Sequence, residues 1–483
     1  MTSDPKSDST DEIVNFVGGR TQRSVTDEFT QLIDPTTGEA NGRTPVTGPA
    51  EVDAAVRSAA DAFETWRRVT PGERQRLLLE LADSVLAHSD ELVALQARDT
   101  GQLKRYIASE EVEQGADQLR FFAGAARLLN GAATAEYLEG HTSSIRREPI
   151  GVIAQVAPWN YPFGMAAWKI APALAAGNTI VLKPSETTPR STVLLAQLAG
   201  EILPPGVFNL VNGDARTGRC LVEHEIPAMV AITGSVRAGI EVARSAASRL
   251  ARTHLELGGK APAVVFGDSD VKSAAEGIAS AAFFNAGQDC TAATRAIVHR
   301  TVLDDFTEAL VSEAQSHRPG APDDTSAALG PLQNRQHFDK VANFVSTLPE
   351  HASVLTGGAQ VGDRGFYFAP TVICNVSQDD AIVQQEVFGP IVTIQPFDDE
   401  AEAVRLANGV PYGIAASAWT SDHGTATRIS GDLDFGCVWI NDHLPFVSEM
   451  PHGGFGISGY GKDLSVYGFE DYTRVKHVMS AHR

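Results

Sequence analysis

The sequence predicts an α/β protein built from two successive blocks of strand–helix units. From Gly151 to Gly259, short apolar runs such as NTIVLKPS alternate with segments of helical periodicity such as STVLLAQLAGEIL. A second alternating block follows from Ala261 to about Ile440. Because repeated strand–helix units form parallel sheets with helices on both faces, each block predicts one such domain. A chain of 483 residues is also long enough for more than one core.

Segments outside the two blocks have patterns of their own. Between Glu51 and Arg98 the apolar residues recur at helical spacing, which predicts a helical entry region. Residues 1–12 are polar and lack the positive charge and apolar run of a signal peptide, so we expect a disordered terminus. Residues 129–147 and 468–483 alternate like strands without an adjacent partner, and we expect their edges to pair with another subunit.

Charge and composition exclude several classes of partner. The chain has 39 Lys and Arg against 60 Asp and Glu, a formal net charge of −21. This excess repels nucleic acid phosphates and anionic membrane surfaces, although scattered acids are also consistent with simple solvation. No run reaches the roughly 18 apolar residues of a membrane span. We therefore expect a cytoplasmic protein without nucleic-acid or membrane partners.

One of the four cysteines has a distinctive setting. Cys220, Cys290, Cys374 and Cys437 are far apart and lack C-x-x-C spacing, which predicts reduced thiols and neither disulfides nor a metal site. Cys290 follows a glycine in FFNAGQDCT, where the backbone can turn tightly and present a thiol. Two interpretations remain, because a lone cysteine is more often a buried small hydrophobe than a nucleophile.

Three further motifs bring polar groups to strand ends. In ELGGK, Glu256 is either an exposed charge or a buried carboxyl whose raised pKa suits a base. In PWNYPF, Asn160 either forms an Asx-turn or donates its amide to an oxyanion. In ITGSVRAG, the backbone N–H groups and the Ser235 hydroxyl suit a pyrophosphate, but the usual G-x-G-x-x-G fingerprint is missing.

Taken as a set, seven motifs resemble a known family. PWNYPF, KPSE, ITGS, ELGGK, GQDCT, EVFGP and PHGGFGISGYG occur in the order and approximate spacing of the aldehyde dehydrogenase superfamily. The resemblance covers the chain from about Asp34 to its end. Within the superfamily, stretches such as EYLEGHTSSIRREPIG and DDAIVQQEVFGP are most similar to γ-aminobutyraldehyde dehydrogenases.

The resemblance implies a division of the chain. A Rossmann-like NAD-binding domain is expected over 13–128 and 148–255, followed by an α/β catalytic domain over 256–457. Residues 129–147 and 468–483 are expected to form a small β arm for oligomerisation. Because the strand-like edges of these segments lack partners, we expect a homodimer or a homotetramer.

The same resemblance implies a thioester mechanism. Cys290, as thiolate, attacks the aldehyde carbonyl, and the oxyanion is held by the Asn160 amide and the Cys290 backbone N–H. A hydride then passes to the nicotinamide, and Glu256 activates the water that hydrolyses the thioester. Lys169 and Asp463 match positions that relay protons away from that base.

Cofactor positions are carried over from the same motifs. Lys183 and Glu186 match family positions that bind the adenosine ribose. Glu386 and Phe388 match positions that bind the nicotinamide ribose and ring. NAD is expected over NADP because the Glu186 carboxylate would repel a 2′-phosphate, unless it turns away and leaves Lys183 to accept the phosphate. The other positions expected at the cofactor are Trp159, Ser185, Thr233, Gly234, Ser235, Gly239, Leu257 and Gly258.

The expected substrate tunnel has aromatic walls. Tyr161, Trp168 and Phe446 are candidates for these walls, and each is equally consistent with ordinary core packing. Where many relatives have an aromatic residue in P-F-G-G, this chain has His452, so one wall is altered.

An acidic helix is a candidate for substrate selection. In EEVEQGADQLRFFAG, Glu110, Glu113 and Asp117 are spaced i, i+3 and i+7 and share one face. In the family this helix borders the tunnel mouth, where carboxylates would attract the ammonium group of an ω-aminoaldehyde such as 4-aminobutanal. The alternative interpretation is a solvated helix face in an acidic protein.

Several other functions compete with aminoaldehyde oxidation. A betaine-aldehyde or broad-range aldehyde dehydrogenase would carry the same motifs. A CoA-acylating semialdehyde dehydrogenase would intercept the thioester with a thiol, and Glu256 argues against it because that chemistry needs no water-activating carboxylate. A catalytically silent structural protein on the same fold is disfavoured by the intact Cys290, Glu256 and Asn160.

Overall fold

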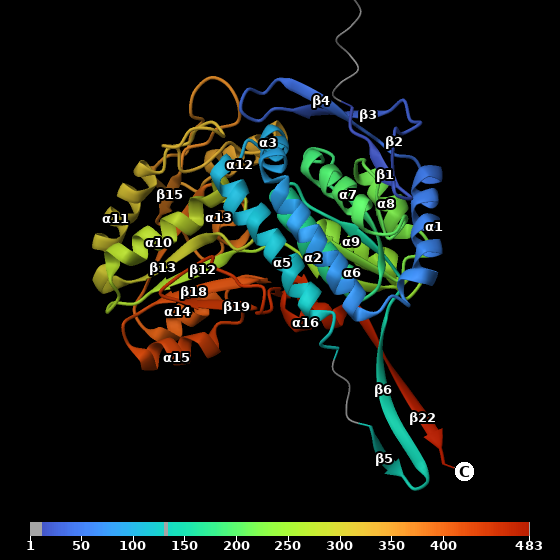
Figure 1. Cartoon of the computed structure of the whole chain (residues 1–483). Coiled ribbons are helices and arrows are strands. Elements are labelled where there is room, and N and C mark those ends of the chain that lie inside the picture. The colour runs from blue at the N-terminus through green and yellow to red at the C-terminus, as the bar shows by residue number, and fades with distance from the viewer. Residues whose placement is uncertain (1–11, 130–133, 483) are drawn as a thin grey trace, which may run out of the picture.

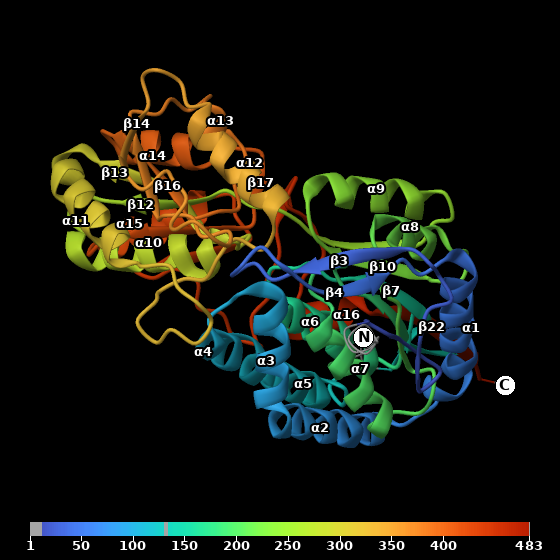
Figure 2. The same ribbon diagram turned by 90° about the horizontal axis from the view of Figure 1, so that it is seen from above.

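The computed structural model describes residues 12–129 and 134–482. Within this part of the chain, two α/β units lie side by side (Figure 1 and Figure 2), and a narrow arm projects from one of them (Figure 1). The expected disordered terminus, residues 1–12, lies outside the described residues except for Glu12, which forms an ion pair with Arg43 at 2.8 Å. No described helix is both long and apolar enough to cross a membrane.

The predicted helical entry region is confirmed. It consists of α1 (Pro49–Trp66), α2 (Pro71–Ala87) and α3 (Ser89–Thr100). The expected apolar faces are buried, with Val56 on α1 and Leu81 on α2 fully enclosed. Each of the first two helices starts with a proline, which suits a first turn whose N–H groups have no helical partner. A hairpin of β3 (Phe29–Ile33) and β4 (Ala40–Pro45) precedes them.

The first α/β unit contains a sheet in the order β2-β1-β9-β8-β7-β10-β11-β21. Strands β7 to β11 are parallel, as the strand–helix alternation predicts. Their apolar runs are continuous because α1, α8 and α9 cover one face of the sheet while α6 and α7 cover the other. The strands are β1 (Asn15–Val17), β2 (Arg20–Gln22), β7 (Val152–Val156), β8 (Thr179–Lys183), β9 (Phe208–Leu210), β10 (Met229–Thr233), β11 (Arg252–Glu256) and β21 (Gly459–Tyr460). The helices are α5 (Gln114–Ala125), α6 (Pro162–Ala175), α7 (Arg190–Ile202), α8 (Ala215–Glu223) and α9 (Val236–Ala247).

The second α/β unit matches the second predicted block. Its sheet has the order β14-β15-β16-β13-β12-β18-β19, parallel except for the edge strand β14. Helices α10 and α11 pack on one face, and α14 and α15 pack on the other. The strands are β12 (Ala261–Val265), β13 (Ala293–His299), β14 (Ser353–Thr356), β15 (Thr371–Cys374), β16 (Ile391–Phe397), β18 (Ala415–Trp419) and β19 (Cys437–Ile440). The helices are α10 (Val271–Phe283), η3 (Arg300–Val302), α11 (Leu303–Ser316), α12 (Arg335–Ser346), α13 (Ala381–Gln384), α14 (Glu400–Ala407) and α15 (His423–Asp432).

The chain returns to the first unit after the second sheet is complete. β17 (Tyr412–Gly413) pairs with β20 (Phe455–Gly456), and β21 then adds to the edge of β11, with Leu255 opposite Tyr460. Helix α16 (Ser465–Asp471) packs against α5 and α6. The C-terminal stretch thus contributes side chains next to the end of β11.

The arm corrects one expectation about strand pairing. The two segments predicted to lack a partner in the chain pair with each other: β22 (Thr473–Ala481) runs antiparallel to β6 (His141–Pro149), which also pairs with β5 (Ala135–Leu138). The bounds differ too, because residues 468–471 belong to α16 and not to the arm. Residues 130–133 lie outside the described residues. The sheet order β22-β6-β5 leaves one edge of β22 and one of β5 open (Figure 1).

Candidate active site

A cavity of about 680 Å³ lies between the two α/β units. It is reached by the carboxyl ends of β10 and β11 and by the loop that leads into β13. In parallel sheets this is where ligands bind, because loops and helix N-termini converge there. Of the predicted catalytic residues, Cys290, Glu256, Asn160 and Asp463 line the cavity. Lys169 is buried on α6 and is not among the lining residues.

The Cys290 thiol is carried by a loop with a strained backbone. Within a short 3-10 turn over Phe284–Gly287 (η2), residues 285–287 have φ between 48° and 69°, in the left-handed region. A Cβ at Gly287 would collide with the backbone carbonyl of Gly389, so only glycine fits there. The turn brings Cys290 into the cavity wall, as predicted from the glycine before it.

The thiol is held neutral by its surroundings. Burial raises the pKa of Cys290 well above its usual value, and the carboxylates of Asp289, Glu386 and Glu256 act in the same direction. A thiolate at this position therefore requires a positive charge nearby.

Asn160 is fixed against the cysteine loop. Its side-chain Nδ2 donates to the backbone carbonyl oxygen of Gln288 at 3.0 Å, and its backbone carbonyl oxygen accepts from Gln102 Nε2 and Asn285 Nδ2, both at 2.9 Å. The residue two positions on is Pro162, which has no backbone N–H to donate to the Asn160 side chain, so the Asx-turn of the alternative interpretation cannot form. The Asn160 carboxamide is therefore held against the Gln288 carbonyl group, two residues before Cys290.

Glu256 is buried at the end of β11 and is not the exposed charge of the alternative interpretation. Its side chain is only 5% exposed, and neither carboxylate oxygen has a hydrogen-bond partner among the described residues. A Cβ at Gly453 would come within 2.5 Å of Oε1, so a glycine backbone covers one side. Burial, and then the neighbouring Asp463 carboxylate, raise the pKa of Glu256 well above its usual value.

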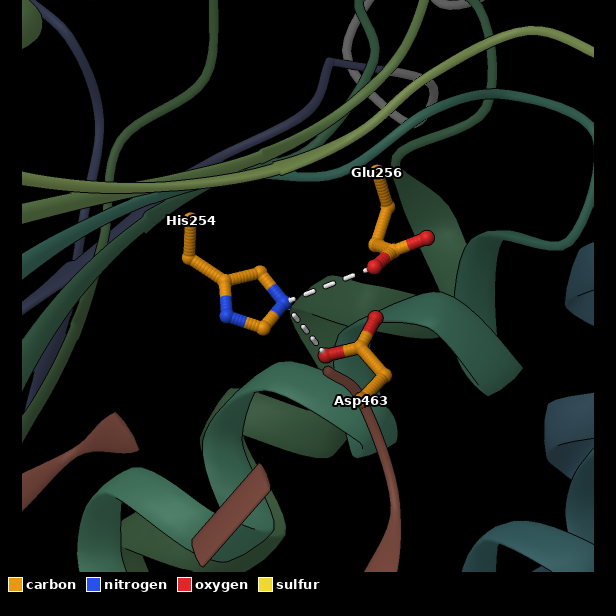
Figure 3. Close-up of side chains that lie close together, drawn as sticks. All are labelled: His254, Glu256 and Asp463. Carbon is orange, nitrogen blue, oxygen red and sulfur yellow. Dashed lines mark ion pairs between the residues drawn. The ribbon is translucent and has the colours of Figure 1, made fainter. Parts of the chain in front are cut away.

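A buried imidazole lies beside this carboxyl group. Figure 3 shows the side chains of His254, Glu256 and Asp463 pointing toward one another. His254 Nε2 is 3.1 Å from Asp463 Oδ1 and 4.0 Å from Glu256 Oε1. His254 was not predicted from the sequence, although a signal was present, because residues i and i+2 of a strand share a face.

The turn after β10 borders the same cavity. Thr233, Gly234 and Ser235 all line it, and Ser235 caps α9 by accepting from the backbone N–H of Ala238 at 3.3 Å. The hydroxyl of Thr233 is buried without a partner among the described residues. An unpartnered hydroxyl beside a helix N-terminus fits an anionic ligand such as a pyrophosphate.

A second group of predicted cofactor residues also lies at the cavity. Glu386 Oε1 accepts from the backbone N–H of Gly259 at 2.8 Å, and a Cβ at Gly258 would meet this carboxylate at 2.5 Å. Phe388 meets Trp159 edge to face at 5.3 Å between ring centroids. Except for Gly259, which was not predicted, these residues line the cavity, as does Leu257.

Other predicted cofactor residues lie away from this cavity. Lys183 Nζ is 3.7 Å from Glu186 Oε2 and donates to the carbonyl oxygen of Pro184 at 2.9 Å, at the end of β8. Ser185 lies in the same turn. Gly239 has a packing role in α9, because a Cβ there would come within 2.5 Å of the Leu257 side chain.

Aromatic rings form the wall near Cys290. Trp168 meets Phe446 at 5.2 Å and His452 at 5.3 Å, both nearly perpendicular. Tyr161 stacks on Phe284 at 6.5 Å, and its hydroxyl donates to Asp289 Oδ2 at 2.7 Å. The predicted wall residues Tyr161, Trp168, Phe446 and His452 all line the cavity and are not confined to the core.

The acidic helix differs from the prediction. Residues Ile107–Glu113, between α4 (Lys104–Tyr106) and α5, form a π-helix, whose wider turn changes which residues share a face. Glu110 lines the cavity, together with Glu111 and Gln114, but Glu113 and Asp117 are exposed and are not among the lining residues. Asp117 instead accepts from Ser448 Oγ at 2.9 Å. Of the three expected carboxylates, only Glu110 lies at the cavity. Its neighbour Glu111, which was not predicted, lies there as well.

Glu111, the unpredicted neighbour, is a buried acid. Its Oε2 accepts from the backbone N–H of Gly164 at 3.0 Å, and Gln96 donates to its Oε1. Burial raises the pKa of Glu111 to about 7. No pattern in the sequence distinguishes it from Glu110.

A thiol, a fixed carboxamide and a buried carboxyl group thus surround one cavity on an α/β fold that has helix N-termini at its edge. The model of the aldehyde dehydrogenase family matches residues 22–478. A phenylacetaldehyde dehydrogenase from Pseudomonas fluorescens is 38% identical over 479 residues, 97% of this chain and 95% of that protein. The chain therefore belongs to the aldehyde dehydrogenase family and is an oxidoreductase with the fold of that family.

Solved structures agree with this assignment. The NAD+ complex of an aldehyde dehydrogenase from Bacillus cereus is 34% identical, with a TM-score of 0.96, and the match covers 98% of this chain and 97% of that one. The betaine aldehyde dehydrogenase from Staphylococcus aureus in complex with NAD+ is 33% identical, with a TM-score of 0.94 and coverage of 97% and 95%. The aldehydes in these names differ from 4-aminobutanal, so the γ-aminobutyraldehyde resemblance is not confirmed.

Proposed function

We propose that this enzyme oxidises an aldehyde to its carboxylic acid through covalent adducts on Cys290. The observation that carries the proposal is the convergence of Cys290, Asn160 and Glu256 on one cavity. Cys290 Sγ attacks the carbonyl carbon, and the Asn160 amide and the Cys290 backbone N–H stabilise the oxyanion of the thiohemiacetal. When bound, NAD supplies a positively charged ring that favours the thiolate and accepts the hydride.

Glu256 then acts on the thioester. Because its pKa is raised, the carboxylate is basic enough to take a proton from a water molecule that attacks the thioester carbon. Lys169, whose Nζ is buried without a hydrogen-bond partner among the described residues, and Asp463 are the positions proposed to relay that proton. Hydrolysis by water releases the acid and restores the Cys290 thiol.

NAD is the cofactor of both solved relatives described above, and the described residues fit it. The buried, unpartnered Thr233 hydroxyl and the N-terminus of α9 suit the pyrophosphate. Glu386 and Phe388 would hold the nicotinamide ribose and ring. Lys183 and Glu186, together at the end of β8, would hold the adenosine ribose.

Glu186 is expected to favour NAD over NADP. Its carboxylate stays beside Lys183, so a 2′-phosphate would meet a negative charge there. In Glu186→Gln, the ratio of kcat/KM for NAD to that for NADP should fall about tenfold, because a charge repulsion of roughly 1.4 kcal/mol is removed. Exposed Glu201→Gln on α7 is the matched control and should leave the ratio unchanged. Equal kcat/KM values in the wild type would contradict this assignment.

The substrate class best supported by the walls is an aldehyde with an aromatic or bulky apolar body. Trp168, Phe446, Tyr161 and Phe284 offer ring faces and edges beside the thiol. The relative that oxidises phenylacetaldehyde is consistent with this class. An ω-aminoaldehyde such as 4-aminobutanal is the second candidate, and Glu110 at the cavity is the observation that favours it.

A kinetic panel separates the candidates. We expect kcat/KM for phenylacetaldehyde to exceed that for butanal about tenfold, because stacked rings contribute roughly 1 kcal/mol or more beyond burial. Glu110→Gln should lower kcat/KM for 4-aminobutanal and leave butanal unchanged. Glu113→Gln with Asp117→Asn is the control, since both side chains lie off the cavity. A wild type that prefers 4-aminobutanal to phenylacetaldehyde would reverse the order of the two candidates.

Adding CoA to the same NADH absorbance assay tests the acceptor of the acyl group. The free acid should remain the product, because Glu256 activates water. An acyl-CoA product would support the acylating semialdehyde dehydrogenase, and no turnover with any aldehyde would support a silent homologue.

We propose that the arm mediates subunit contacts in a homodimer or homotetramer. Open edges of β5 and β22 and exposed apolar side chains such as Val475 (60% exposed) support this. Val475→Asp should weaken the assembly, while Val25→Asp, at an exposed position outside the arm, should not. Sedimentation velocity measures both, and a wild-type monomer at micromolar concentration would rule out the assembly.

A further inference from the structure

Gln102 lies where the two α/β units meet behind the active site. It follows Gly101, which ends α3 with a φ of +70°, and a Cβ at Gly101 would come within 2.5 Å of Pro331 in the second unit. The Gln102 side chain is buried, although the proposed chemistry does not use it. A buried carboxamide is costly unless its polar atoms are paired. Its hydrogen-bond partners therefore indicate what this residue does.

Both donors of the Gln102 carboxamide are used at the active site. Gln102 Nε2 donates to the backbone carbonyl oxygen of Asn160 at 2.9 Å and to Asn285 Oδ1 at 3.1 Å. Asn285 Nδ2 donates to the same Asn160 oxygen at 2.9 Å and to the Gln288 carbonyl oxygen at 3.3 Å. Asn160 belongs to the first unit, whereas Asn285 and Gln288 belong to the loop that carries Cys290. Gln102 thus joins the proposed oxyanion donor to the nucleophile loop.

The orientation of the Gln102 carboxamide is fixed from its other end. Gln96 Oε1 accepts from the backbone N–H of Phe163 at 3.2 Å. Because a backbone N–H can only donate, Gln96 must present its oxygen there and use Nε2 as a donor elsewhere. Gln96 Nε2 donates to Gln102 Oε1 at 3.0 Å and also to Glu111 Oε1. Gln102 therefore turns its oxygen toward Gln96 and its two N–H groups toward Asn160 and the nucleophile loop.

The nucleophile loop needs this support because its backbone is strained. Asn285 has a φ of 48°, a conformation that persists only where the surroundings hold the residue in place. Gln102 is the only described donor to Asn285 Oδ1. Without the Gln102 donors, this buried oxygen loses its partner and the loop is free to relax away from Asn160.

We propose that Gln102 is a positioning residue that holds Asn160 and the Cys290 loop in the alignment that the oxyanion requires. This inference rests on the proposed role of the Asn160 amide as an oxyanion donor. Gln102 is not among the residues that line the cavity, so it acts through Asn160 and Asn285 and not on the substrate. Such donors are effective only when they are fixed at hydrogen-bond distance from the developing charge, so a small displacement slows the reaction.

Single-turnover kinetics on the full-length enzyme, in excess over phenylacetaldehyde and with saturating NAD, tests this role. Gln102→Met keeps the length of the side chain but removes both donors, so the rate constant for NADH formation should fall about tenfold. NAD binding measured by calorimetry should be unchanged, because the proposed cofactor residues do not contact Gln102. Exposed Gln315→Met, on α11, is the matched control and should equal the wild type.

Gln102→Glu gives a readout that a merely structural role would not move. When protonated, its carboxyl group can donate one hydrogen bond to the Asn160 carbonyl oxygen, and when ionised it cannot donate. Burial raises the pKa of such a carboxyl group, and so do Glu110 and Glu111, which line the same small pocket as Gln102 together with Tyr106 and Tyr161. The ratio of the Gln102→Glu rate to the Gln102→Met rate should therefore exceed one at low pH and fall as the pH rises.

A normal rate in Gln102→Met, or a rate ratio that does not change with pH, would overturn the positioning role. If Gln102→Met does not fold, as judged by thermal unfolding, the Gln102→Glu rate is compared with the wild-type rate at each pH. Asn160→Ala separates this inference from the proposed function. If Asn160→Ala also reacts at the wild-type rate, the oxyanion role of Asn160 is wrong. If Asn160→Ala is slow while Gln102→Met is normal, only the role of Gln102 is overturned.

Discussion

Replacing Cys290 with alanine should abolish aldehyde oxidation while leaving NAD binding unchanged. Every proposed step begins on Sγ, so no partial route remains once the sulfur is removed. The loss in kcat should be on the order of 10⁴-fold or more, as for the removal of other covalent nucleophiles. Binding should persist because Thr233, Ser235 and Glu386, the residues proposed to hold the cofactor, do not depend on the thiol. Turnover by NADH absorbance and binding by calorimetry measure the two properties.

The other cysteines supply the control for this experiment. Cys437 is half-buried on β19 and burial raises its pKa to about 11, so Cys437→Ala should keep normal kcat. If Cys290→Ala retains turnover, the covalent mechanism is wrong. If it loses cofactor binding as well, the substitution has disturbed the strained loop at residues 285–287.

Replacing Glu256 with glutamine should separate the two halves of the reaction. In the proposed mechanism acylation and hydride transfer do not need its carboxylate, so NADH should appear in a burst close to one equivalent per active site. The steady state should then slow by roughly 10²- to 10⁴-fold, the usual contribution of a general base. Acyl-enzyme detected by mass spectrometry on Cys290 would identify the species that accumulates.

The same variant predicts a change in pH dependence. Because burial and Asp463 raise the pKa of Glu256, the carboxylate fraction grows only as pH rises through that raised value. The wild-type deacylation rate should therefore increase with pH above the usual range of a glutamate, and Glu256→Gln should lose this dependence. An unchanged steady-state rate in the variant would remove Glu256 from the mechanism.

The fold was largely predictable because strand–helix periodicity is local. The runs NTIVLKPS and MVAITGS become the parallel strands β8 and β10, as expected from their flanking helical segments. The pairing of β6 with β22 was not predictable in this way. Thr473 lies opposite Pro149, more than three hundred residues earlier, and periodicity contains no information about partners at that separation.

The site was predictable where a motif is short and its backbone constrained. The glycine before Cys290 and the strand end at Glu256 indicated the two groups, although family resemblance was needed to choose between their alternatives. The acidic helix was misjudged because ordinary 3.6-residue spacing was applied to a π-helix, whose insertion leaves no clear composition signal. His254 was missed because a histidine on a buried strand is usually an ordinary core residue without a role in the chemistry.

The late position of β21 and β22 in the sequence has a consequence for synthesis of the protein. β21 covers the edge of β11, β22 covers the edge of β6, and Asp463 completes the surroundings of Glu256, yet all three leave the ribosome long after β6 and β11. Until then the growing chain exposes two strand edges that can pair with other chains. A chain that stops before Gly459 keeps its nucleophile but presents both edges permanently. We therefore expect truncated chains to be found as aggregates and not as folded, inactive enzyme.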